Sequence, residues 1–182
     1  MWLAFLDESG VLMAPLVRQT WSPRGHTPVL QHRTRAHQKV SVVAALCVPP
    51  TRDHVHMYFR LHPNRNITAT EVVAFLRLLQ RHLNGPLVLL WDRSRPHRAK
   101  TVQAFLTPSA RIHPVFFPAY APELNPIEYA WGYLKRNPCA NWAPLDLEQL
   151  VVGTRRSSQA LQRRADLLRS FLHHSPLSLR LK

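Results

Sequence analysis

Apolar residues along the chain fall into short runs that are separated by charged residues, prolines and glycines. In the first third of the chain these runs are short and bounded by polar residues, glycines or prolines, and the run Lys39–Val48 is also rich in β-branched residues, which is typical of strands. Each run predicts one strand, and the expected strands are Trp2–Leu6, Val11–Val17, Lys39–Val48 and Val55–Leu61. The proline and glycine residues between positions 21 and 28 predict a turn.

The middle of the chain alternates helical and strand patterns instead. A helix is expected at residues 71–83, with Thr70 as its N-cap. Strands at Pro86–Trp91 and Ile112–Phe117 then enclose a helix at His97–Leu106. Consecutive early strands favour antiparallel pairing, whereas the later alternation favours parallel strands joined by helical crossovers. We therefore predict an α/β fold with a mixed sheet flanked by helices.

The segment from Ala121 to Lys135 carries the strongest signal for the start of a helix. Asn125 suits the N-cap, and Pro126 suits the first helical position, where its missing N–H costs nothing. The apolar residues that follow have helical spacing: Ile127, Ala130, Trp131 and Leu134. Glu128 lies three residues after the cap, so two readings are open. It can close a capping box with Asn125, or it can point across the helix start into a metal site.

From Pro144 onward the chain becomes basic and helical. We predict a division into a main domain at residues 1–143 and a basic helical C-terminal extension at residues 144–182. A short helix is expected after Asp146, and a second one at Ser157–His173. The arginines of this extension fit either a solvated helix face or a surface that contacts phosphates; they are Arg155, Arg156, Arg163, Arg164 and Arg169.

The overall charge narrows the range of partners. The chain of 182 residues has 24 Lys and Arg against 10 Asp and Glu, which gives a net charge of +14. Such an excess predicts a polyanionic partner, most simply nucleic acid, although a basic protein without such a partner is the alternative. Two cysteines make no disulfide framework, and the apolar run at the N-terminus is too short for a membrane span or a signal peptide. We therefore expect a cytoplasmic protein with no membrane association.

Three of the scarce acidic residues occur at the ends of predicted elements. Asp7 follows the first strand, Asp92 follows the strand Pro86–Trp91, and Glu128 opens a helix. Because ligands gather at the carboxyl ends of adjacent strands in open sheets, these side chains are expected to meet. Clustered carboxylates repel one another unless a cation neutralises them, and oxygen ligands favour Mg²⁺ or Mn²⁺. A pair of such ions is suited to phosphodiester cleavage.

Four phrases in this order resemble a known family: Phe-Leu-Asp-Glu-Ser-Gly, Trp-Ser-Pro-Arg-Gly-His-Thr-Pro, Trp-Asp with His-Arg downstream, and Ala-Pro-Glu-Leu-Asn-Pro-Ile-Glu-Tyr-Ala-Trp-Gly-Tyr-Leu-Lys. They look like the DDE catalytic domain of mariner-like bacterial insertion-sequence transposases, over residues 2–140. The resemblance implies an RNase H-like, five-stranded mixed sheet. It also implies Asp7, Asp92 and Glu128 as the metal-binding catalytic triad, with two Mg²⁺ or Mn²⁺ ions. These would cut DNA at transposon ends and join the 3′-hydroxyl to target DNA.

The chain departs from the family pattern at one position, since Arg93 stands where the family commonly has Asn. An arginine there would change the local charge, and it is a candidate phosphate contact. His97 matches the family's downstream histidine and is expected either to position the scissile strand or to have a structural role only. The further candidates for contact with nucleic acid are Arg98, Lys135 and Arg136.

The resemblance leaves other functions open. Family members generally carry an N-terminal helix-turn-helix region, so the alternative is a non-catalytic DNA-binding remnant of a truncated or frameshifted transposase. We expect a helix-turn-helix region of this kind to be either fused to the chain or separately encoded. We also expect the chain to form a homodimer and to be located at the bacterial nucleoid. A third reading is an RNase H-like nuclease acting on RNA hybrids or junctions. Glu8 is treated as secondary because it would face away from Asp7, and Trp21, Trp131 and Trp142 are expected in the core.

Overall fold

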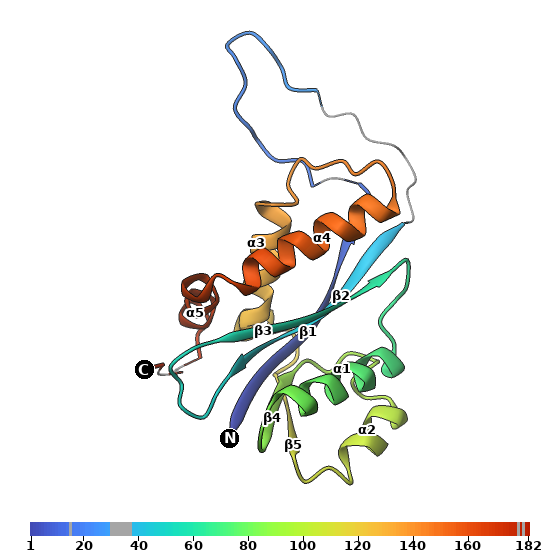
Figure 1. Ribbon diagram of the computed structural model, residues 1–182, viewed down its shortest axis with the longest axis vertical. Helices are drawn as coiled ribbons and strands as arrows, with labels where there is room; N and C mark the ends of the chain where they lie inside the picture. Colours follow the sequence, from blue (N-terminus) through green and yellow to red (C-terminus); the bar gives the residue numbers. More distant parts are fainter. Residues whose placement is uncertain (15, 30–37, 178, 180) are drawn as a thin grey trace.

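A five-stranded mixed sheet lies at the centre of the computed structural model, which describes residues 1–14, 16–29, 38–177, 179 and 181–182 (Figure 1). The strand order is β3-β2-β1-β4-β5. β1 pairs antiparallel with β2 and β2 with β3, whereas β4 is parallel to both β1 and β5. The predicted combination of an antiparallel meander with parallel additions is confirmed. The strands are β1 (Trp2–Leu12), β2 (Lys39–Val48), β3 (His56–Pro63), β4 (Leu87–Trp91) and β5 (Ile112–Phe116).

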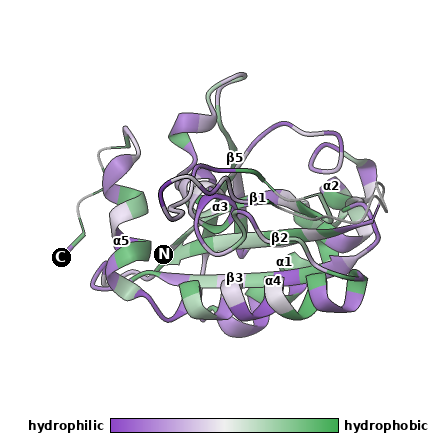
Figure 2. Ribbon diagram, turned by 90° about the horizontal axis from the view of Figure 1, so that it is seen from above, coloured by the Kyte–Doolittle hydropathy of each residue, from purple (hydrophilic) through white to green (hydrophobic). Residues whose placement is uncertain are grey.

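Helices cover both faces of this sheet. One core forms between the sheet and α1 and α2, and a second between the sheet and α3, α4 and α5. In Figure 2 the central strands have mainly apolar colours, while the flanking helices show both apolar and hydrophilic residues. The helices are α1 (Ala69–His82), α2 (Lys100–Leu106), the 3₁₀ turn η1 (Pro122–Leu124), α3 (Pro126–Arg136), α4 (Leu147–Gln162) and α5 (Ala165–His174). No helix in the described ranges is sufficiently long and apolar for a membrane span.

Strand β1 is longer than expected, and this matters for Asp7. The predicted end at Leu6 and the separate strand at Val11–Val17 are wrong, since β1 continues to Leu12. The polar residues from Asp7 onward keep their backbone pairing with β2, from Asp7 opposite Ala44 to Leu12 opposite Lys39. Pairing with β4 ends earlier, at Phe5 opposite Leu90. Asp7 therefore lies inside a strand, yet beyond the last pair with its parallel neighbour. Pro15, within the expected second strand, lies outside the described residues.

Other boundaries differ for local reasons. The N-cap of α1 is Thr68 instead of Thr70, because Thr68 forms a capping box with Glu71. α2 begins only at Lys100, after a turn in which the N–H of Ala99 bonds the carbonyl of Pro96. The predicted turn before Pro28 is confirmed at Gly25, which has a φ of 83°. Trp21 is 99% exposed, so its expected place in the core is wrong.

The basic C-terminal segment packs on the sheet. α4 runs to Gln162 and α5 starts at Ala165, so the helix expected at Ser157–His173 is divided between these two elements. Leu150 of α4 and Leu168 of α5 are fully buried in the same core as Phe5 of β1. The division of the chain at residues 143 and 144 stays a prediction.

Candidate metal centre

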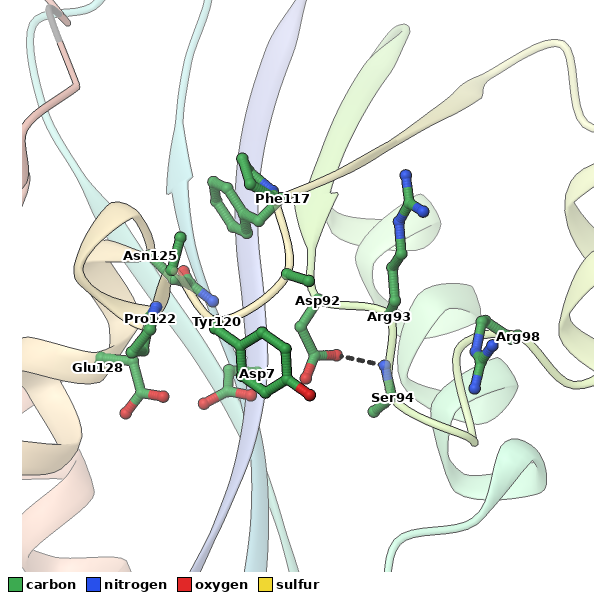
Figure 3. Close-up of a pocket in the computed structure, with 13 residues that line it drawn as sticks. Asp7, Asp92, Arg93, Ser94, Arg98, Phe117, Tyr120, Pro122, Asn125 and Glu128 are labelled. Carbon is green, nitrogen blue, oxygen red and sulfur yellow. Dashed lines mark hydrogen bonds between the residues drawn. The ribbon is translucent and has the colours of Figure 1, made fainter.

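The three acidic residues singled out from the sequence line one pocket. This pocket of about 590 Å³ contains Asp7 of β1, Asp92 after β4 and Glu128 of α3. Figure 3 shows the three carboxyl groups extending toward the same side of the pocket, with the ring of Tyr120 in front of Asp7. The remaining lining comes mainly from the segments after β4 and β5: Arg93, Ser94, Arg98, Phe117, Pro118, Ala119, Tyr120, Ala121, Pro122 and Asn125.

Asp7 is held by the helix that carries Glu128. The indole Nε1 of Trp131 donates a hydrogen bond of 2.9 Å to Oδ2 of Asp7. Burial, assisted by the negative charges of Glu128 and Glu8, raises the pKa of Asp7 to about 7, although the bond from Trp131 opposes this rise. A carboxyl group in such a setting gains from a nearby cation, because the cation favours its ionised form.

Asp92 has a different environment. Its Oδ1 accepts a bond of 2.9 Å from the backbone N–H of Ser94 and lies 2.7 Å from Nδ1 of His97. The bond with His97 holds the pKa of Asp92 below its usual range, against the effect of burial. Burial alone would lower the pKa of His97, but its bonds with Asp92 and Glu8 raise that pKa to about 9. The ring is completely buried and stacks on Trp91 at a centroid distance of 4.3 Å.

Glu128 does not form the capping box that the sequence allowed. Asn125 occupies the N-cap position of α3, but its side chain makes no capping bond. Its Nδ2 donates instead to the carbonyl of Leu6 at 3.2 Å, and its backbone N–H bonds the carbonyl of Pro122. The helix start is thereby tied to β1 next to Asp7. Burial raises the pKa of Glu128, Lys135 lowers it, and the charge of Asp92 raises it.

The basic candidates are distributed around the carboxylates. Arg93 and Arg98 line the pocket, and the guanidinium carbon of Arg93 lies 5.6 Å from the centre of the Phe116 ring. In Figure 3 the Arg93 side chain extends away from the carboxyl group of Asp92. Lys135 lies outside this pocket, while Arg136 lines a neighbouring groove with Glu128. Because His97 is completely buried, the structure favours its structural role over a direct contact with DNA.

Comparison with known proteins identifies the family. A family model described as DDE superfamily endonuclease matches residues 2–151. The chain belongs to this family. No curated protein sequence gives a significant match.

Solved structures support the same fold for this DDE endonuclease. The Mos1 transposase paired-end complex with left transposon end matches with a TM-score of 0.68 and 18% identity, over 96% of this chain and 52% of that chain. The Mos1 mariner paired end complexes with Mn and with Mg give TM-scores of 0.66 and 0.65, at 19% and 16% identity. They cover 96% and 94% of this chain and 52% of each Mos1 chain. The chain thus spans about half the length of these Mos1 chains, and the predicted RNase H-like fold is confirmed.

The donor set of the DDE endonuclease suits a hard divalent cation. Carboxylate oxygens of three residues face one pocket, and within the described residues no lysine or arginine makes an ion pair with any of them. In the part of the chain that the structure describes, no three His, Cys, Asp or Glu side chains are close enough together to hold a metal ion as they stand. Side-chain rotation is therefore needed to close the carboxylates on an ion, as expected for like charges that repel one another.

Two side-chain contacts around the carboxylates are not predicted by the pattern of the sequence. Trp131 was expected only as part of the apolar stripe, yet its buried indole N–H needs an acceptor and finds Asp7. Glu8 is expected to face away from Asp7. Its side chain does extend from the opposite face of the sheet, where it bonds His97. A buried indole and an acidic residue inside a strand are the signals that point to such partners.

Proposed function

We propose that this DDE superfamily endonuclease is the catalytic domain of a transposase. It would cut DNA strands at the ends of an insertion sequence. The freed 3′-hydroxyl would then attack a phosphodiester of the target DNA, which joins the two strands and releases a 3′-hydroxyl of the target. The observation that carries the proposal is the meeting of Asp7, Asp92 and Glu128 in one pocket of a chain whose net charge is +14. A basic surface around an acidic pocket suits DNA phosphates and a metal together.

The proposed cofactor is Mg²⁺ or Mn²⁺, with two ions. Asp7 and Asp92 would hold one ion, and Asp7 and Glu128 would hold the other. The Mos1 complexes described as containing Mn and Mg support this choice for a related fold. When bound, such ions activate a water or a 3′-hydroxyl and stabilise the leaving oxygen. The chain's own residues orient the carboxylates, since Trp131 holds Oδ2 of Asp7 and Ser94 holds Oδ1 of Asp92.

DNA is the proposed partner, both as transposon end and as target. Arg93 and Arg98 would contact phosphates at the pocket, and Lys135 and Arg136 would do so along α3. The Mos1 complex with left transposon end supports DNA binding for a related fold. We also propose a homodimer, a helix-turn-helix region that recognises the element ends, and a location at the bacterial nucleoid. Residues 1–143 would form the catalytic domain, and residues 144–182 its basic extension.

A cleavage assay tests the proposal. The wild-type chain is incubated with Mg²⁺ or Mn²⁺ and duplex DNA carrying the inverted repeats that flank its gene. We expect metal-dependent nicking, which Asp92→Asn abolishes while circular dichroism shows an unchanged fold. Asp166→Asn, at an exposed position of α5, is the matched control and keeps the activity. Unchanged nicking by Asp92→Asn would refute the assignment. A wild-type chain that binds the repeats without cutting them would instead be a DNA-binding remnant.

A further inference from the structure

Glu8 is next to Asp7 in β1, but its side chain extends from the opposite face of the sheet. Ala4 and Leu6, which alternate with Phe5, pack in the core under α1 and α2, and Glu8 continues this row. It does not line the carboxylate pocket. Its Oε1 instead lies 2.8 Å from Nε2 of His97, and its side chain is only 17% exposed. Glu8 therefore has no direct access to an ion in the pocket. It is bonded, however, to His97, which in turn bonds Asp92 in the pocket.

His97 connects Glu8 to Asp92 through the two nitrogens of one buried ring. Nδ1 lies 2.7 Å from Oδ1 of Asp92 and 3.1 Å from the backbone oxygen of the same residue. Because a carbonyl oxygen only accepts, this geometry requires the hydrogen on Nδ1. The stacked ring of Trp91 covers one face of the imidazole. Contacts at both nitrogens and on one face therefore fix the orientation of His97.

The bonds to the Asp92 carboxyl group fall on a single oxygen. Ser94 and His97 both bond Oδ1, and within the described residues no hydrogen bond involves Oδ2. A carboxylate held by one oxygen presents the other in a defined direction. At a metal site such an arrangement reduces the freedom that the ligand loses when the ion binds.

We propose that Glu8 is a positioning residue, which acts through His97 to orient the Asp92 carboxylate for a divalent cation. This inference rests on the proposed function, because it takes Asp92 as a metal ligand. Outer partners of metal ligands typically change metal affinity about 10- to 100-fold when they are removed. His97 is the direct partner of Asp92, and Glu8 is one bond further from the ion, so the contribution of Glu8 is expected at the lower end of that range, about tenfold.

Mn²⁺ binding measured by isothermal titration calorimetry tests the role without relying on activity. Glu8→Ala should raise the Kd for Mn²⁺ about tenfold, the lower end of the range for partners of metal ligands. Glu8→Gln should give an intermediate Kd, because its amide oxygen still accepts from His97 but the charge is lost. The control Glu148→Ala removes an equal charge from an exposed position of α4 and should stay within about twofold. A Kd for Glu8→Ala within twofold of wild type overturns the proposal.

A double-mutant cycle separates positioning from other effects. In a His97→Asn background, Glu8→Ala should change the Kd by less than about twofold, because the connection is already broken. If Glu8→Ala raises the Kd in the His97→Asn background as much as it does in the wild type, Glu8 acts by its charge alone, and the positioning role is overturned. A lower melting temperature with unchanged Kd would also overturn it. If Glu8→Ala does not fold, Glu8→Gln decides: a Kd for Mn²⁺ more than twofold above that of wild type supports the role, and a Kd within twofold overturns it. Absence of Mn²⁺ binding by the wild type would overturn the metal assignment itself, together with this role.

Discussion

The indole Nε1 of Trp131 donates a hydrogen bond of 2.9 Å to Oδ2 of Asp7, which joins β1 to the helix that carries Glu128. A second bond, from Nδ2 of Asn125 to the carbonyl of Leu6, joins the same two elements one residue before Asp7. The relative position of the two carboxylates thus depends on contacts between β1 and α3. Metal binding between them should be sensitive to these contacts.

Trp131→Phe should test this dependence. The phenyl ring retains most of the apolar contact, but the partly buried carboxyl group of Asp7 loses its donor. We expect the free energy of unfolding in urea to fall by about 1–3 kcal/mol, because a bond to a charged acceptor is removed. The affinity for Mn²⁺ should also decrease by about tenfold.

The control for this change is Tyr129→Phe, which removes a hydrogen bond from the same helix to the carbonyl of His174. That bond lies at an exposed position, so the free energy of unfolding should change by less than about 0.5 kcal/mol and Mn²⁺ affinity should not change. Equal effects of the two substitutions would argue against a special role for Trp131.

The raised pKa of Asp7 predicts how stability depends on pH in the absence of metal. Burial raises this pKa to about 7 in the folded chain, against about 3.9 for an unfolded one. A carboxyl group with a raised folded pKa stabilises the fold at low pH, and this contribution is lost as the pH rises through the folded value. The wild type should therefore lose stability relative to Asp7→Asn between about pH 4 and pH 7, at up to about 1.4 kcal/mol per pH unit.

Chemical denaturation of both proteins across this pH range measures the difference. Added Mg²⁺ should stabilise the wild type at pH 8 but not Asp7→Asn, since an ion bound only by the folded state adds to its stability. A difference between wild type and Asp7→Asn that stays constant from pH 4 to pH 8 would contradict the assigned environment of Asp7.

Arg93 should affect DNA binding more than metal binding. Its guanidinium group lies over the Phe116 ring and extends away from the carboxyl group of Asp92. Arg93→Asn should therefore leave the Kd for Mn²⁺ within about twofold, while weakening DNA binding at all sequences. If Arg93 contacts one phosphate, the slope of log affinity against log salt should fall by about 0.9. A large change in Mn²⁺ affinity with no change in salt dependence would contradict this role.

The pattern of the sequence predicted the order and class of the elements well because the relevant signals are local. A β-branched, mostly apolar run predicted β2, an alternating pattern predicted β3, and proline and asparagine predicted the start of α3 at Pro126. The continuation of β1 through Asp7 was missed, because those polar residues remain in the strand only through pairing with β2. Such pairing is a long-range effect that residue type alone does not reveal.

In the candidate site, too, the sequence predicts what depends on local signals but not what depends on contacts between distant residues. The three carboxylates could be predicted because acidic residues are scarce, because each stands at the end of an element that the sequence predicts, and because the helix-start phrase resembles a known family. The side-chain bonds that orient them were not predicted. Asn125 suits a cap by residue type, yet it bonds Leu6, a residue 119 positions away in the chain. The partner of His97 is likewise 89 positions away, in β1.

The central claim concerns the convergence of three side chains on divalent cations, and crystals grown with Mn²⁺ test it most directly. An anomalous-scattering map should show at least one Mn²⁺ peak in the pocket, about 2.0–2.3 Å from carboxylate oxygens of Asp7 and of either Asp92 or Glu128. Asp7→Asn crystals should lack that peak. A map of the wild type at saturating Mn²⁺ with no peak between these carboxylates would contradict the account.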